Sequence, residues 1–177
     1  MTSPDTITWT TRTSAADVSW TSICWSPQLL LFCAVASTGT AAQMVMTSPD
    51  GITWTSRTAA STNAWQAITW SPILNLFAAV SNTGTATRVM TSPDGITWTT
   101  RTSAVDNSWS SITWSTELSM FCAVSTDGTN NRIMVSTNGT TWVARYTVTA
   151  ATYSGIAWSP TLRLFASPAA SVVMINA

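Results

Sequence analysis

The sequence predicts an all-β protein: a β-propeller of four-stranded antiparallel blades, with four blades in the chain. Three observations predict this fold. Aromatic residues recur every 44 or 45 residues, each repeat holds four short strand-like segments, and one turn motif occurs in every repeat. A fixed period of this length is typical of repeat architectures, and four short strands per repeat match one propeller blade.

The repeat is most visible in the tryptophans. Trp9, Trp54, Trp98 and Trp142 lie 45, 44 and 44 residues apart, and three further aromatic series have the same spacing. The 177 residues are therefore predicted to form one domain, 1–177, made of the repeats 1–45, 46–89, 90–133 and 134–177.

Within the second copy, the local signals all favour strands. Ala64–Trp70 alternates between two faces, and Leu76–Val80 is a continuous apolar run that suits a strand buried on both faces. Two short β-branched segments follow, Thr87–Thr91 and Ile96–Arg101, with a Gly-containing turn before each. The copy is therefore predicted to form four antiparallel strands in chain order.

The repeat places three complete blades in the middle of the chain, at Ser19–Arg57, Ala64–Arg101 and Ser108–Arg145. The last blade, Tyr153–Asn176, supplies three strands, and we expect the N-terminal strand Thr6–Thr11 to complete it and close the ring. Closure removes open sheet edges. It can occur within one chain or between chains, so an eight-bladed ring of two chains or an open-ended assembly are alternatives.

The turn motif reads SPDGITW at Ser48–Trp54 and Ser92–Trp98, SPDTITW at Ser3–Trp9 and STNGTTW at Ser136–Trp142. Its Asp or Asn is expected to accept hydrogen bonds from backbone N–H groups of a tight turn, and its Gly to adopt a positive φ. Its Trp is expected to fill the space between neighbouring sheets. Thr6 replaces the Gly in the first copy, which predicts a strained or differently shaped turn. The structural residues of the motif are Asp5, Asp50, Asp94, Asn138, Trp9, Trp54, Trp98 and Trp142.

The motif resembles the Asp-box, or bacterial neuraminidase repeat, S-x-D-x-G-x-T-W, of sialidase-like propellers. The copies here are one residue shorter between Asp and Trp, and they look like the contracted boxes of repeat-rich phage and bacterial proteins. The resemblance covers essentially the whole chain. It implies a propeller fold with the boxes remote from the sialidase active site, and it implies no particular activity.

Composition excludes several functions. Seven arginines balance seven acidic residues, there is no histidine or lysine, and only 8% of residues are charged. We expect neither a nucleic-acid surface nor membrane insertion, and no signal peptide is visible. The cysteines Cys24, Cys33 and Cys122 favour buried free thiols, although a bridge between Cys24 and Cys33 across one hairpin is an alternative.

Catalysis is not expected. A sialidase site requires an arginine cluster, a Tyr/Glu nucleophile pair and an acid/base Asp, whereas this chain offers only Tyr146, Tyr153 and Glu117. Without His or Lys, general-base triads, Schiff-base chemistry and histidine metal sites are absent. We expect no enzyme activity, no cofactor and no metal.

Two repeated series are candidate ligand-binding residues. Arg12, Arg57, Arg101 and Arg145 each follow a motif Trp by three residues, and Trp20, Trp65, Trp109 and Tyr153 open the first strand of each blade. The arginines suit an anionic ligand such as a carboxylate-bearing sugar. Their alternative role is to pair with backbone carbonyls or loop acids such as Asp17 and Asp106. The aromatic series suits either sugar stacking or the core between blades.

Taken together, these features predict a non-catalytic binding or adhesion module for a glycan or another surface ligand. The variable loops between blades, such as Thr58–Asn63 and Thr102–Asn107, are the expected recognition sites. The chain is also expected to form a homo-oligomer, in an extracellular or virion-associated setting. The alternatives are a structural protein that self-assembles through its split terminal blade and, more remotely, a sialidase-like glycoside hydrolase.

Overall fold

The computed structural model describes residues 1–147, 151–169 and 172–175, and these form an all-β protein of four antiparallel sheets. The first blade is β1 (Trp20–Ser26), β2 (Leu31–Ala36), β3 (Val45–Ser48) and β4 (Thr55–Arg57), with a short 3₁₀ helix, η1 (Ala41–Gln43), before β3. The second is β5 (Trp65–Ser71), β6 (Leu76–Ser81), β7 (Val89–Ser92) and β8 (Thr99–Arg101). The third is β9 (Trp109–Ser115), β10 (Met120–Ser125), β11 (Ile133–Ser136) and β12 (Val143–Arg145). The last sheet is β13 (Ala157–Ser159), β14 (Leu164–Ala169) and β15 (Val172–Ile175).

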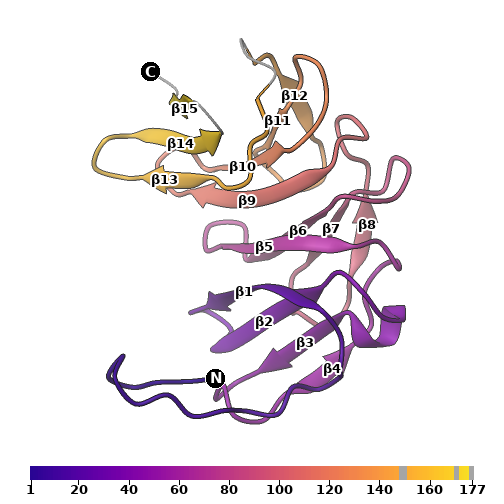
Figure 1. Ribbon diagram of the computed structural model, residues 1–177, viewed down its shortest axis with the longest axis vertical. Helices are drawn as coiled ribbons and strands as arrows, with labels where there is room; N and C mark the ends of the chain where they lie inside the picture. Colours follow the sequence, from indigo (N-terminus) through magenta and orange to yellow (C-terminus); the bar gives the residue numbers. More distant parts are fainter. Residues whose placement is uncertain (148–150, 170–171, 176–177) are drawn as a thin grey trace.

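The four sheets follow one another in an arc, with the N-terminal segment at one end and β13–β15 at the other (Figure 1). β1 packs against β5, β5 against β9, and β9 against β13. Within each sheet the strands pair in chain order. Sequential antiparallel pairing requires only short turns, which explains how four strands fit in one 44-residue repeat.

The fourth strand of each blade is shorter than predicted. Ile96–Arg101 was expected to be extended, whereas β8 begins only at Thr99. The reason is that the N–H groups of Ile96 and Thr97 donate to the side chain of Asp94 rather than to a neighbouring strand. The residues of the motif therefore form the turn, and the strand starts after its Trp.

Each blade has two distinct faces, which we call front and back. The front face is the one that turns toward the preceding blade, and it carries large apolar side chains, among them the motif Trp. In the second blade these residues are Ile68, Trp70, Phe77, Ala79, Met90 and Trp98. They pack against the back face of the first blade, which includes Cys33, Val35 and Val45. Such residues are nearly inaccessible to solvent, so the core of the protein lies between blades.

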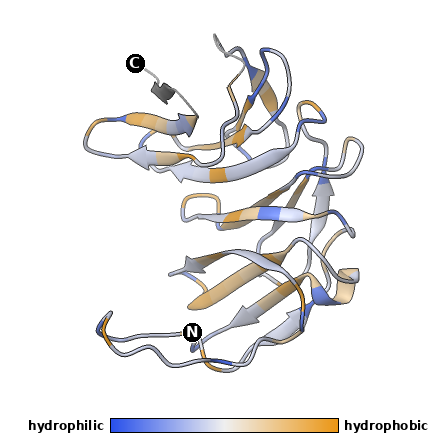
Figure 2. Ribbon diagram, viewed as in Figure 1, coloured by the Kyte–Doolittle hydropathy of each residue, from blue (hydrophilic) through white to orange (hydrophobic). Residues whose placement is uncertain are grey.

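The central strands are the most apolar elements. β2 is hydrophobic along most of its length (Figure 2), and Cys33, Ala34, Val35 and Ala36 are at most 1% exposed. A central strand of a closed propeller is covered on both faces by neighbouring sheets and so has no polar face, which fits the continuous apolar sequence of β2 and of its counterparts β6 and β10.

The N-terminal segment brings more than the single strand predicted. Thr2 and Thr10 form an antiparallel bridge with two backbone hydrogen bonds of 2.9 and 2.8 Å. In the repeat, Thr2 corresponds to Thr47 in β3. The segment therefore forms a hairpin in the position of a third and a fourth strand, held by one bridge, and the strand predicted at Thr6–Thr11 is replaced by bends up to Thr8 and the bridge at Thr10. Closure of the ring by this segment stays a prediction, since in the described residues the last sheet consists of β13, β14 and β15.

The three cysteines are free thiols. Cys24 and Cys33 face each other across β1 and β2. Burial raises the pKa of the thiol of Cys33 well above its ordinary value, and it raises that of Cys122 to about 12. Both are therefore protonated, unreactive core residues.

No helix in the described part of the chain is long and apolar enough to cross a membrane.

Candidate functional site

The motif turns have one geometry in all four copies. In the second copy, the Oδ1 atom of Asp50 accepts the backbone N–H groups of Ile52 and Thr53, both at 2.8 Å, and the hydroxyl of Ser48 at 2.9 Å. Ser48 Oγ in turn accepts the N–H of Gly51 at 2.9 Å. Asn138 accepts the equivalent N–H groups with its amide oxygen at 2.9 and 2.8 Å, so the geometry needs an acceptor rather than a charge.

These hydrogen bonds change the acidity of the motif carboxylates. The backbone N–H groups of Thr53 and Ile52 lower the pKa of Asp50 to about 2. In Asp94, burial acts to raise the pKa, but the hydrogen bonds from Thr97 and Ile96 outweigh it and the pKa is lowered. Both carboxylates are thus ionised acceptors that hold a turn, a structural role.

The first turn keeps the shared shape with a strained residue. Thr6 has a φ of +65°, close to the +70° of Gly51. Asp5 still accepts the N–H groups of Ile7 and Thr8, at 2.9 and 2.8 Å. A β-branched residue in the left-handed region is unfavourable, so the expected strain is present while the expected change of shape is not.

The motif tryptophans lie where neighbouring blades meet. The indole N–H of Trp98 donates to the carbonyl of Gly95 at 3.2 Å, and its ring lies 6.3 Å from that of Phe77. Trp142 has the same two contacts, with Gly139 and Phe121. In contrast, Trp9 at the N-terminal end of the arc is 57% exposed.

The arginine series has a partner that the sequence analysis did not consider. The Nε atoms of Arg12, Arg57 and Arg101 donate to threonine hydroxyls on the third strand, at 3.0, 3.0 and 2.9 Å. The fourth member, Arg145, is exposed, and Val135 occupies the threonine position. The expected pairing with Asp106 is made by a different residue, Arg88.

The aromatic series is mostly inaccessible. Trp65, Trp109 and Tyr153 are 0% exposed, so no sugar can stack on them in this structure. Their inter-blade position favours the core role. Trp20 is the accessible member and lines a surface pocket.

The residues considered for catalysis are dispersed. The carboxylate of Glu117 accepts the indole N–H of Trp158 at 2.5 Å, as the amide of Gln28 does for Trp70 at 2.7 Å. Glu117 therefore joins two blades. No group of three or more possible metal ligands occurs among the described residues.

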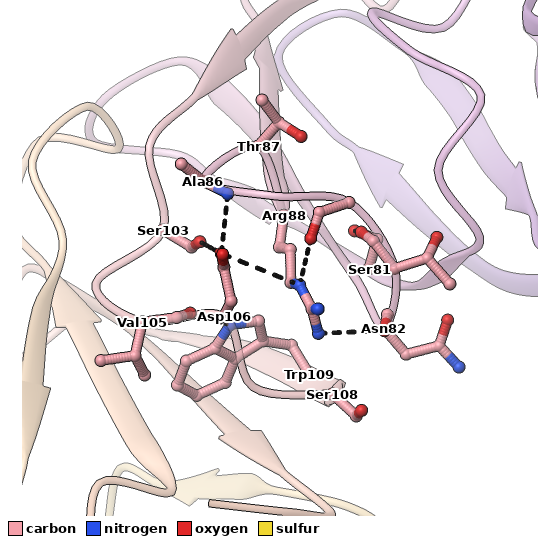
Figure 3. Close-up of polar contacts among 12 residues, drawn as sticks. Ser81, Asn82, Ala86, Thr87, Arg88, Ser103, Val105, Asp106, Ser108 and Trp109 are labelled. Atoms are coloured by element: carbon pink, nitrogen blue, oxygen red, sulfur yellow. Dashed lines mark hydrogen bonds and ion pairs between the residues drawn. The ribbon is translucent and has the colours of Figure 1, made fainter.

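The loops between the second and third strands meet the loops between blades along one edge of the arc, which we call the loop end. Arg88 is central to it (Figure 3). Its guanidinium donates to the carbonyls of Gly84 at 2.7 Å and Asn82 at 3.0 Å, and its Nε lies 3.9 Å from Asp106 Oδ1. Asp106 also accepts the N–H of Ala86 at 2.7 Å, which fixes a residue with a φ of +54°.

Other side chains hold the same loops. Asn63 donates to the carbonyl of Thr87 at 2.8 Å, and Asn107 donates to that of Asn131 at 2.9 Å. Asp127 accepts the backbone N–H and the hydroxyl of Ser108. These anchors were not predicted from the sequence, although Arg88 and Arg132, like Asn63 and Asn107, recur at the 44-residue spacing.

Exposed residues of the loop end are small and polar. Thr40, Thr85 and Thr129 occupy one repeat position and are all exposed, while the next position holds Ala41, Ala86 or Asn130. Hydroxyl and amide groups can donate and accept hydrogen bonds. The loop end thus combines a fixed loop backbone with a repeated exposed threonine and small neighbouring side chains, a surface that can form hydrogen bonds with a polar ligand.

A pocket lies against the front face of the first blade. It is a pocket of about 400 Å³ whose lining includes Met1, Arg12, Trp20, Ile23 and Trp54. One candidate arginine and one candidate aromatic residue thus meet here, between the N-terminal hairpin and the first blade.

The repeated sheets and their arrangement define the class: the chain is a β-propeller repeat protein. No family model matches it, and neither does any curated protein. Among solved structures it is similar to a β-propeller chain from the "Crystal structure of Nidogen/Laminin Complex", with a TM-score of 0.64 and 10% identity. The match covers 89% of this chain and 60% of the other. At this identity the likeness shows the fold.

Proposed function

We propose that the protein is a non-catalytic binding module of the Asp-box type, which presents its loop end to a glycan or another surface ligand. The observation that carries this proposal is the combination of a fixed backbone with small exposed side chains at the loop end, a repeated threonine among them. Arg88, Asp106 and Asn107 hold the loops, while exposed positions such as 85 and 130 carry the side chains free to make contacts. Binding residues are often found on loops that a rigid scaffold positions.

The chemistry of this end supports a glycan. The chain has no net charge, and exposed threonine and asparagine side chains offer paired donors and acceptors like those that sugar hydroxyls require. The motif turns support the Asp-box assignment, because each places an acceptor side chain on two successive backbone N–H groups.

Binding to a printed array of neutral and sialylated oligosaccharides tests the proposal. We expect the wild type to bind a subset of the array and a Thr85→Arg/Asn130→Arg variant to lose that signal. The matched control is Thr53→Arg, an exposed threonine in a motif turn, which should bind as the wild type does. The absence of any wild-type signal, or equal binding by both variants, would contradict the proposal.

Two further arms separate the alternatives. A Trp20→Ala variant that loses binding while the loop variant keeps it would move the site to the pocket on the first blade. Hydrolysis of a fluorogenic sialoside by the wild type, lost in Glu117→Gln, would contradict the non-catalytic assignment.

A further inference from the structure

The first blade exposes a face that the other blades bury. Ile23 is 54% exposed, whereas its counterparts Ile68 and Ile112 are 5% and 6% exposed. Trp25, beside it on β1, is 38% exposed. In the second and third blades this front face is covered by the back face of the preceding blade. The repeat therefore shows what kind of surface covers it.

The pocket of about 400 Å³ lies on this same face. One side of it is formed by the N-terminal hairpin, through Met1 and Arg12, which supplies the third and fourth strands of a blade. The pocket lies where the first and second strands of that blade would run. A two-stranded element with a small apolar back face fits this space.

The opposite end of the arc presents such an element in β13 and β14, the first two strands of the sheet that β15 completes. Ala157 and Pro168 on its back face are exposed, whereas Val80 and Val124, the counterparts of Pro168, are 0% exposed. Two further back-face residues of β14 are Ala166, which corresponds to Cys33 and Ala78, and Leu164, which corresponds to Leu31 and Leu76 in the covered blades. This uncovered back face is small and apolar, and it complements the uncovered front face.

We propose that two copies of this chain join head to tail, with β13 and β14 of one copy seated on the front face of the first blade of the next. The N-terminal hairpin of the second copy then lies at the outer edge of the seated sheet, next to β15, so that strands of two chains meet in one blade. Each joint buries Ile23 and Trp25. A contact between different surfaces of identical chains leads to a closed ring or an extended chain of copies.

The internal joints indicate the hydrogen bonds that the new joint would form. Thr21 Oγ1 donates to the carbonyl of Trp65 in the next blade at 2.8 Å, and Ser110 Oγ donates to that of Tyr153 at 2.7 Å. Ser154 occupies the same position in the last repeat and is exposed. In the assembly its hydroxyl reaches the carbonyl of Trp20 of the second copy.

Docking within one chain is disfavoured by the arrangement of the arc. β13 packs on β9, and the N-terminal hairpin lies at the other end, beyond the first blade (Figure 1). A zero net charge gives little repulsion between copies. This surface is distinct from the loop end, and the proposal does not depend on glycan binding.

Sedimentation of two complementary variants tests the joint. Ile23→Glu places a charge on the front face, and Ala157→Glu places one on the back face; both residues are exposed in the single chain, so the fold tolerates the change. We expect the wild type to sediment at two or more times the chain mass of 18.9 kDa and each variant alone to sediment as a single chain. An equimolar mixture keeps one intact joint, so its mass should double to that of a two-chain complex.

The matched control is Ile52→Glu, which changes an isoleucine that is 50% exposed in a turn of the same blade. It should assemble as the wild type does, and circular dichroism should show the same fold for all variants. Assembly by Ala157→Glu alone would indicate a front-to-front contact and overturn the proposal. A wild type that remains a single chain at high micromolar concentration, or a mixture that gains no mass, would also overturn it.

Discussion

The carboxylate of Asp50 links the stability of a turn to pH. Its pKa is about 2 in the folded protein, below its ordinary value of 3.8, because the N–H groups of Thr53 and Ile52 donate to the ionised form. A depressed folded-state pKa contributes stability that is complete above the unfolded-state value and is lost as pH falls through the folded-state value. The loss from this group therefore falls between about pH 4 and pH 2.

An Asp50→Asn variant should lose less stability on acidification than the wild type. Asn138 shows that an amide oxygen can accept the same two N–H groups, at 2.9 and 2.8 Å. Urea unfolding at pH 7 and pH 2.5 measures the effect. We expect a lower midpoint for the variant at pH 7, because a neutral amide accepts more weakly than a carboxylate, and a smaller acid-induced decrease in the variant. An equal decrease in both proteins would show that the motif carboxylate does not carry the pH dependence.

Trp114 offers a second prediction at the residue scale. Its indole Nε1 is buried without a hydrogen-bond partner, whereas Trp70 and Trp158 donate to Gln28 and Glu117. The corresponding position in the second repeat is Ile73. An unsatisfied buried donor is costly, and a new hydrogen bond contributes on the order of 1 kcal/mol. Ile73→Gln should therefore raise the free energy of unfolding by about 1 kcal/mol.

Chemical denaturation of Ile73→Gln beside Ile73→Met measures this gain, because methionine has a similar length and offers no comparable acceptor. Equal unfolding midpoints for the two variants would show that the glutamine does not reach the indole.

Among the elements, the N-terminal hairpin is the one that a single substitution should stabilise most. Thr6 adopts a φ of +65°, where glycine carries no steric cost, and a non-glycine residue costs roughly 1 kcal/mol or more. Thr6→Gly should therefore stabilise the hairpin. We expect slower hydrogen exchange of the Thr2 and Thr10 amides, which donate across the hairpin. Thr8→Gly is the control, since it adds chain entropy without relieving strain and should speed the same exchange.

The positions of the strands could be predicted from the sequence better than the side-chain contacts between them. The period of the tryptophans and the apolar run at β6 predicted the blades, because both reflect burial between sheets. The predicted length of β8 was wrong, because the carboxylate of Asp94 accepts backbone N–H groups that would otherwise pair with the neighbouring strand. The hydroxyl partner of Arg57 was not predicted. Arg57 pairs with Val45 of the adjacent strand, and Thr47 lies two residues further along that strand, so their contact can be deduced only once the register is known.

The roles of the candidate ligand-binding residues also could not be predicted from the sequence alone. Repetition alone cannot separate a core aromatic from a binding aromatic, and burial assigns Trp65, Trp109 and Tyr153 to the core. The anchors of the loop end, Arg88 and Asp106, come from different repeats, so their meeting depends on how one blade sits against the next.

At the scale of the whole molecule, the arc has two uncovered ends that match the surfaces joined inside it. Blades one to three contact one another through front and back faces, and the same two kinds of face remain exposed at Ile23 and Ala157. Burying apolar side chains drives association, and exposed apolar patches of this kind mark interaction sites. The account therefore predicts an assembly of chains in which every blade has two neighbours.

Native mass spectrometry of the wild-type chain tests this claim most directly. We predict a dominant species at two or a higher whole multiple of 18.9 kDa. In a dilution series, the share of this assembled species should rise with protein concentration. A single species at 18.9 kDa over the whole micromolar range would contradict it.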